Sequence, residues 1–424
     1  MIISSSNRTE WSNPDFWREK LPSLTITDIP AGGESVDGKN AATDNPKGQI
    51  RRKQLQTHGF ALVDEPIAPQ EDIERLRQGI THLHRNLKVP ASFILLFDET
   101  WHLAEKSKKV LNESTLETNR FHADILAWYI EDNGFSPHRD RQPDEARESF
   151  SGLDAKFVTQ WIALSEASPE NSCLYMIPKA QDPGYVEGDS EAADPLCLAL
   201  PNKQAYQYIR AFPRRQGQSV LFTHRIIHWG SKRVPDTNQQ HRIAISFVCA
   251  DPAFERPYVD SKHLDNGCPP FHIRLLLVCA QMLMYYQRFN LSKDSIRGCY
   301  EFCKANEDEL EESYRQKVFV EFVKAMKEQK AADPASSVPA NGIQNSEEED
   351  PDEEAMMEEM LQAAQKGYGE FADDYDEEFD NEEEGERDED FDVSKEEEDA
   401  VLQFRKRSLS DDNLAMDKKL KSKH

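Results

Sequence analysis

The stretch SVLFTHRIIHWGSKRVPDTNQQHRIAISF, residues 219–247, contains two short apolar runs joined by a polar loop. Both runs are rich in β-branched and aromatic residues, which favours strands over helices. The loop holds Gly, Ser, Pro, Asp and Asn, which are typical of turns. The pattern therefore predicts a strand, a turn and a return to a neighbouring strand.

Short apolar runs of this kind extend over about residues 121–250. Turn residues such as Asn133-Gly134, Pro169 and Gly217 separate them. Several short strands at such spacing predict a β sandwich or barrel. The other runs are HADILAWYIED (122–132), KFVTQWIALSEA (156–167), CLYMIP (173–178) and CLALP (197–201).

The segments on either side of this region have a different periodicity. Residues 57–67 predict one more strand, and residues 68–87 predict an amphipathic helix with acidic residues in its first turn. Residues 262–331 carry broad apolar faces at helical spacing, so we expect helices that pack on the β core. The expected organisation is an extended lead-in (1–49), a core domain (50–260), a helical extension (261–331) and a tail (332–424).

The net charge of −27 is concentrated in the tail. Residues 346–400 contain 28 Asp and Glu against three Lys and Arg, so the rest of the 424-residue chain is nearly neutral. A segment this charged cannot bury a core and is expected to be disordered. Its scattered aromatic residues are typical of segments that bind basic proteins, and it ends in small Lys/Arg clusters.

The seven cysteines are scattered and form no CxxC pair, which favours buried free thiols over a zinc site. We expect no secretory signal and no membrane span, and therefore an intracellular protein, cytoplasmic or nuclear. The terminal basic clusters fit a nuclear address as well as a soluble end. No direct nucleic-acid binding is expected.

The segment FSPHRDRQPD, residues 135–144, offers a pair of metal ligands. Residues two apart in a strand point the same way, so His138 and Asp140 can face one ion. With 12 histidines in the chain, chance alone could supply such a pair. His228, in the second apolar stretch, would complete the two-His-one-carboxylate triad that suits iron(II). His224, four residues earlier, is a rival ligand.

Arg242 begins the strand that follows the loop after His228. A guanidinium can hold a carboxylate with two parallel hydrogen bonds. An oxygenase that uses 2-oxoglutarate needs such a cation for the distal carboxylate of this co-substrate. Arg242 is therefore a candidate to bind it.

Five pieces of the chain occur together in the order of a known family, and they span about residues 54–250. In this respect the chain resembles the phytanoyl-CoA dioxygenase family of iron(II)- and 2-oxoglutarate-dependent oxygenases. The pieces are THGFALVDE (57–65), PHRD (137–140), WIALSEASPENSCLYMIP (161–178), IIHWGS (226–231) and RIAIS (242–246).

The resemblance implies a mainly β fold with a double-stranded β-helix (jelly-roll, cupin-like) core flanked by helices. It implies that the triad holds Fe(II) and that Arg242 pairs with 2-oxoglutarate, with O2 as the other co-substrate. It also places Trp161 in the co-substrate pocket and Ser231 beside it. On the strand before the first ligand, either Trp128 or Tyr129 should face the metal cavity, and we assign Tyr129 to it.

The implied activity is hydroxylation of a C–H bond with release of succinate and CO2. The carboxylate of Asp140 favours hydroxylation, because related halogenases replace it with a small residue. The chain departs from the family at Arg139, where Gln is frequent, and at Lys179-Ala180-Gln181, where Gly-Ser-His is frequent. The substrate, a small molecule or an acyl compound, stays open. The alternative is an inactive jelly-roll scaffold whose acidic tail binds a basic protein partner.

Overall fold

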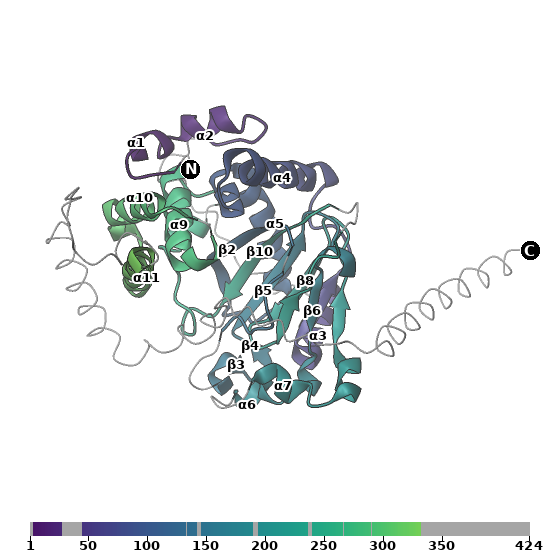
Figure 1. The fold of residues 1–424 in the computed structure, drawn as a ribbon. Helices are drawn as coiled ribbons and strands as arrows, with labels where there is room; N and C mark the ends of the chain where they lie inside the picture. Colours follow the sequence, from purple (N-terminus) through teal and green to yellow (C-terminus); the bar gives the residue numbers. More distant parts are fainter. Residues whose placement is uncertain are drawn as a thin grey trace, which may run out of the picture. The chain divides into compact units, whose positions relative to one another are not determined.

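The computed structural model describes residues 3–27, 45–132, 134–141, 146–189, 194–235, 240–265, 267–289 and 291–331 (Figure 1). The predicted disordered acidic tail, residues 332–424, lies outside the described residues.

A five-stranded antiparallel sheet forms the centre of the described part. Neighbouring strands come from distant parts of the chain, so the sheet connects the N-terminal third to the region of the apolar runs (Figure 1). In sheet order its strands are β1 (Phe60–Val63), β8 (Ser219–Thr223), β5 (Phe157–Ala163), β10 (Arg242–Ala250) and β2 (Arg120–Ile130).

A second antiparallel sheet of three strands packs against one face of the first. Side chains alternate along β5, so Trp161 and Ala163 point to this face and join a cluster with Leu174 and Phe212 of the smaller sheet. The smaller sheet consists, in order, of β7 (Arg210–Phe212), β6 (Leu174–Met176) and β9 (His228–Gly230). The strands β3 (Phe150–Ser151) and β4 (Asp154–Ala155) form a separate hairpin.

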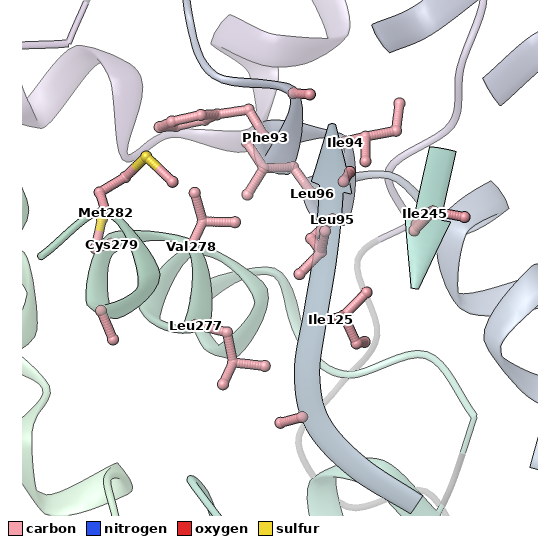
Figure 2. Close-up of a cluster of buried hydrophobic side chains, with 14 of the residues drawn as sticks. Phe93, Ile94, Leu95, Leu96, Ile125, Ile245, Leu277, Val278, Cys279 and Met282 are labelled. Carbon is pink, nitrogen blue, oxygen red and sulfur yellow. The ribbon is translucent and has the colours of Figure 1, made fainter. Parts of the chain in front are cut away.

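Helices cover the other face of the five-stranded sheet. Every residue of β10 is buried, because the small sheet lies on one side of it and helices on the other. The covering elements are α5 (Asp98–Ser114), the 3-10 segment η2 (Ala91–Leu96) and α9 (Phe271–Met284). Figure 2 shows the core that η2 and α9 share with β2 and β10, with Leu95, Leu96, Ile125, Ile245, Leu277 and Val278 among its labelled side chains.

Four of the remaining helices lie in the predicted helical segments: α4 (Gln70–His82, continued by the π-helix η1, Leu83–Leu87), α8 (Lys262–Asp265), α10 (Lys293–Ala305) and α11 (Glu312–Ala331). Two were not predicted: α3 (Pro46–His58), which precedes β1, and α6 (Gly184–Glu187), which lies within the region of the short apolar runs.

Two local predictions are wrong. The lead-in is not extended throughout, because α1 (Arg8–Trp11) and α2 (Pro14–Lys20) bury Trp11 and Trp17 in the core. Asn13 caps α2 by accepting from the Asp15 N–H, and Pro14 fits the first helical position. The run at 197–201 is not a strand, because the helix α7 (Pro195–Ala199) begins just before it with the same kind of cap, from Asp194.

The described chain is thus a mixed α/β protein with antiparallel sheets flanked by helices. Its finer description as a double-stranded β-helix stays a prediction, as do the four domain boundaries. Five of the seven cysteines are buried and all are free, as the sequence predicted. Among the described helices, none combines the length and the apolar character that a membrane crossing requires.

Candidate metal centre

The side chains of His138, Asp140 and His228 come together as the sequence predicted. One potential ligand atom from each lies within 4.8 Å of the other two. The Asp140 Oδ1 atom is 3.4 Å from Nε2 of His228 and 3.8 Å from Nε2 of His138. His228 is nearly buried, whereas His138 and Asp140 keep 22% and 23% of their side chains exposed. The three ligands therefore form a site that opens to solvent on one side.

The backbone brings the two histidines together through a short antiparallel bridge. The His138 N–H donates to the His228 carbonyl at 3.0 Å, and the His228 N–H donates back at 2.9 Å. The Asp140 N–H donates to the His224 carbonyl at 3.1 Å. Residues 136–140 are thus paired with residues 224–228 without forming a full strand ladder.

Each histidine has one ring nitrogen engaged by its own backbone. His138 Nδ1 lies 2.7 Å from the Ser136 carbonyl, and His228 Nδ1 lies 3.1 Å from the Ile226 carbonyl. A carbonyl only accepts, so each Nδ1 must carry the proton and each Nε2 keeps its lone pair. These are the tautomers that a metal ion requires, and the hydrogen bonds fix the ring orientations.

Asp140 is oriented in a similar way by Thr159 of β5, which donates to Oδ2 at 2.9 Å and leaves Oδ1 facing the histidines. Burial raises the pKa of the Asp140 carboxyl, but protonated His228 and His138 rings in the metal-free protein and the Thr159 hydrogen bond outweigh it, so the pKa is lowered. The carboxylate form is the one that coordinates a cation. Nothing in the sequence near Asp140 indicated Thr159, which lies on another strand.

Arg242, at the start of β10, is a buried cation. Its Nη1 donates to the Ser172 carbonyl at 2.7 Å, and its guanidinium lies 5.8 Å from the ring centre of Trp161. Its Nε is buried without a hydrogen-bond partner, and no carboxylate of the described residues pairs with it. Burial lowers the pKa of Arg242 to about 10. An unpaired cation at this position is suited to an anionic ligand.

Ser172 lies beside Arg242, and the sequence did not indicate it. It is fully buried, takes the left-handed conformation with φ of 73°, and its Oγ has no hydrogen-bond partner among the described residues. Gly230 lies directly beside it: a Cβ at Gly230 would be 3.1 Å from Arg242 Nη1 and 3.2 Å from Ser172 Oγ. Its backbone also touches Gly134, so neither glycine has room for a side chain.

Two of the predicted pocket residues lie elsewhere. Tyr129 pairs with Ile243 and therefore points to the helix-covered face of the sheet, where it stacks on His84 at 4.3 Å. Trp128 points to the face of the site instead and contacts Phe135 at 4.6 Å. Ser231 follows β9, its Oγ lies 3.5 Å from the Pro169 carbonyl, and no contact of it with Arg242 is found in the described part.

The rival ligand His224 points away from the other three side chains. Its Nδ1 lies 2.9 Å from the Phe157 carbonyl, and its ring is surrounded by Phe150, Phe157 and Phe254. Burial lowers the pKa of His224 to about 3, so the ring is neutral. The four-residue spacing that made it a rival does not apply, because β8 ends at Thr223 and a turn precedes β9.

Residues 61–234 match the family model of phytanoyl-CoA dioxygenase (PhyH). The matched segment covers less than half of the 424-residue chain. The triad lies inside the matched phytanoyl-CoA dioxygenase segment, and Arg242 lies eight residues beyond its end. The resemblance seen in the sequence is therefore confirmed.

Several solved structures are similar to part of this chain. The non-haem alpha-ketoglutarate-dependent epimerase SnoN from nogalamycin biosynthesis is 14% identical, with 49% of this chain and 82% of that chain covered and a TM-score of 0.34. AviO1 from Streptomyces viridochromogenes Tue57 is 16% identical (50% and 98% covered, TM-score 0.32). The carbocyclase SnoK is 16% identical (57% and 95% covered, TM-score 0.34). A search of curated protein sequences gives no match.

Proposed function

We propose that this protein is an iron(II)- and 2-oxoglutarate-dependent dioxygenase that hydroxylates a C–H bond of its substrate. The observation that carries the proposal is the pairing of two features within one site. His138, Asp140 and His228 offer two imidazole nitrogens and one carboxylate oxygen, and the guanidinium of Arg242, a buried arginine without a carboxylate partner among the described residues, lies beside Gly230, two residues after His228. The family-model match over residues 61–234 supports the same function.

The donor set fits iron(II). Two neutral imidazoles and one carboxylate are the ligands of the facial triad, which leaves further coordination positions for a co-substrate and O2. The hydrogen bonds of both Nδ1 atoms and of Asp140 Oδ2 leave the Nε2 side of each ring and Asp140 Oδ1 facing one another, as a shared ion requires. When bound, the metal supplies oxygen activation coupled to decarboxylation of 2-oxoglutarate to succinate and CO2.

The residues of the chain would orient the reactants. Arg242 would hold the distal carboxylate of 2-oxoglutarate, and Trp161 would cover the guanidinium on one side. Because Arg242 is 2% exposed, water is excluded from this end of the pocket and the ion pair would be strong. The exposed sides of His138 and Asp140 would then face the substrate.

Oxygen-dependent succinate formation tests the proposal. With Fe(II) and 2-oxoglutarate, the full-length protein should release succinate over a panel of small-molecule and acyl substrates. H138A should abolish this release, because it removes one of three ligands. H84A is the matched control, since His84 stacks on Tyr129 on the opposite face of the sheet. Undiminished succinate release by the double variant H138A/D140A would disprove the proposal.

No feature of the residues that the structure describes favours the alternative of an inactive scaffold. Its partner-binding tail lies outside the described residues, and the ligand set and the arginine that a dead scaffold would have no need to keep are all in place.

A further inference from the structure

Arg139, between the first two ligands, is the most completely hydrogen-bonded side chain of the site. Because residues alternate, it points away from the metal side into a fully buried position, with 1% of its side chain exposed. It binds Asp182 through both oxygens at 2.6 and 2.8 Å, and Asp189 through both oxygens at 2.6 and 2.7 Å. A fifth bond reaches the Arg225 carbonyl. All five N–H donors of the guanidinium are therefore used.

A second arginine makes the cluster electrically neutral. Arg225, also 1% exposed, lies 3.6 Å from Asp189 and donates to the Gly184 carbonyl at 2.9 Å and to the Arg141 carbonyl at 3.3 Å. Two arginines thus face two aspartates in a volume closed to solvent. We call this group the Arg139 quartet: Arg139, Arg225, Asp182 and Asp189.

The quartet joins three segments, of which only two carry metal ligands. Arg139 lies between His138 and Asp140, and Arg225 lies three residues before His228. The two aspartates come from residues 182–189, a segment without a ligand. The ligand-bearing segments are joined to each other by backbone hydrogen bonds around the His138–His228 bridge and not by a continuous strand ladder. The quartet adds side-chain hydrogen bonds that join both segments to residues 182–189.

We propose that the Arg139 quartet positions the metal ligands, with residues 182–189 acting as a clamp that holds the segment of His138 and Asp140 against that of His228. Arg139 is thus a positioning residue and touches no reactant. The role rests on the proposed metal centre. It also accounts for two departures from the family together, because Lys179-Ala180-Gln181 form the short turn η5 that leads directly into Asp182, a partner of Arg139.

Metal affinity without turnover tests this role. The metal-free, full-length protein is titrated with Mn²⁺ alone by calorimetry, and with Co²⁺ to record the visible absorption bands that report ligand geometry. We expect R139Q to raise the Kd for Mn²⁺ by about 10- to 100-fold, the usual loss when the groups that orient metal ligands are removed. The Co²⁺ spectrum should change shape as well as intensity.

R274Q is the matched control. Arg274 forms a buried ion pair with Asp98 at 2.7 Å, with 0% and 5% of the two side chains exposed, and touches neither ligand segment. It should lower thermal stability while leaving the Kd for Mn²⁺ and the Co²⁺ spectrum as in wild type. This separates the positioning role from a general loss of a buried arginine.

The double variant R139Q/D182N covers the case in which R139Q fails to fold, because it leaves Asp189 facing Arg225 and keeps the buried cluster neutral. We expect it to regain thermal stability but to keep the weakened Mn²⁺ binding. Wild-type Mn²⁺ affinity in folded R139Q, or recovery of affinity together with stability in the double variant, would overturn the positioning role alone. A wild-type protein that binds no Mn²⁺ would overturn the metal centre as well.

Discussion

Two buried arginines, Arg139 and Arg242, lie near the metal ligands, and they differ in the number of carboxylate and hydrogen-bond partners that the protein supplies. Both are 2% exposed. Arg139 has every donor bonded, four times to carboxylate oxygens. Arg242 has one bond to a carbonyl, an unbonded Nε and no carboxylate among the described residues.

The contrast distinguishes a charge that serves the fold from one that serves a ligand. A buried charge without a partner destabilises the folded protein, so we expect one only where it binds a ligand of opposite charge. Arg139 is compensated within the chain and belongs to the architecture. Arg242 is compensated only when an anion arrives, which is why it belongs to the proposed co-substrate pocket.

The largest expected effect separates the two arginines directly. R242M should leave the ligand-free protein as stable as wild type or more so, because it removes an unpaired charge, while raising the KM for 2-oxoglutarate about 100-fold or more. R139M should instead lower the free energy of unfolding by about 3–5 kcal/mol, because it leaves two aspartates facing only Arg225. Urea unfolding measures the free energy of unfolding, and succinate formation measures the KM for 2-oxoglutarate. Equal destabilisation by R242M and R139M would contradict the distinction between the two arginines.

His224 should make the stability of the protein depend on pH. Its Nε2 atom is buried and has no hydrogen-bond partner among the described residues. Its pKa is about 3 in the folded protein against an ordinary value of 6.5. Between these two pH values His224 is protonated in the unfolded chain but not in the folded protein. The free energy of unfolding therefore decreases as the pH falls from 6.5 toward 3, by about 1.4 kcal/mol per pH unit.

H224N should remove this loss, because Asn keeps a donor for the Phe157 carbonyl and does not titrate. Unfolding free energies of wild type and variant at pH 7, 6 and 5 give the two slopes. A variant as acid-sensitive as wild type would show that other groups govern this range.

Thr159 offers a smaller effect on the metal side. T159V removes the donor that holds Asp140 Oδ2, and we expect the Kd for Mn²⁺ to rise about tenfold. S107A is the control, because Ser107 donates at 2.8 Å to Gln160, the next residue of β5, on the opposite face. Equal Mn²⁺ binding by T159V and S107A would remove Thr159 from the account of the site.

Ser172 should have the smallest effect, on the side of Arg242. Loss of its hydroxyl costs one neutral hydrogen bond to the co-substrate, so S172A and S172G should each raise the KM for 2-oxoglutarate about three- to tenfold. S172G also relieves the left-handed backbone and should be the more stable of the two. If only S172A impairs the KM, backbone strain rather than the hydroxyl is responsible.

The residues that sequence reasoning found share a local signature. His138 and Asp140 follow from the alternation of an extended segment, and Arg242 follows from its place at the start of a strand. The helices of residues 68–87 and 262–331 follow from apolar periodicity. The caps at Asn13 and Asp194, each before a proline, were also readable and would have corrected the lead-in and the run at 197–201.

The residues that it missed depend on contacts between distant segments. Arg139 meets Asp182 and Asp189 more than 40 residues away, and nothing near Arg139 indicates them. The choice between Trp128 and Tyr129 depends on the register of β2 against β10. Because β2 carries apolar residues on both faces, its sequence does not indicate which of the two side chains faces the site. The double-stranded β-helix itself stays a prediction.

The contact between Gly134 and Gly230 has a consequence for redesign. Gly230 approaches Arg242 and Ser172 with backbone atoms, so no side chain at this position can be shortened to enlarge the pocket. An engineer who wanted to admit a bulkier 2-oxo acid would have to move a strand. A methyl group added at Gly230 would lie 2.9 Å from the Gly134 Cα and 3.1 Å from Arg242 Nη1, so G230A would also require the backbone to shift.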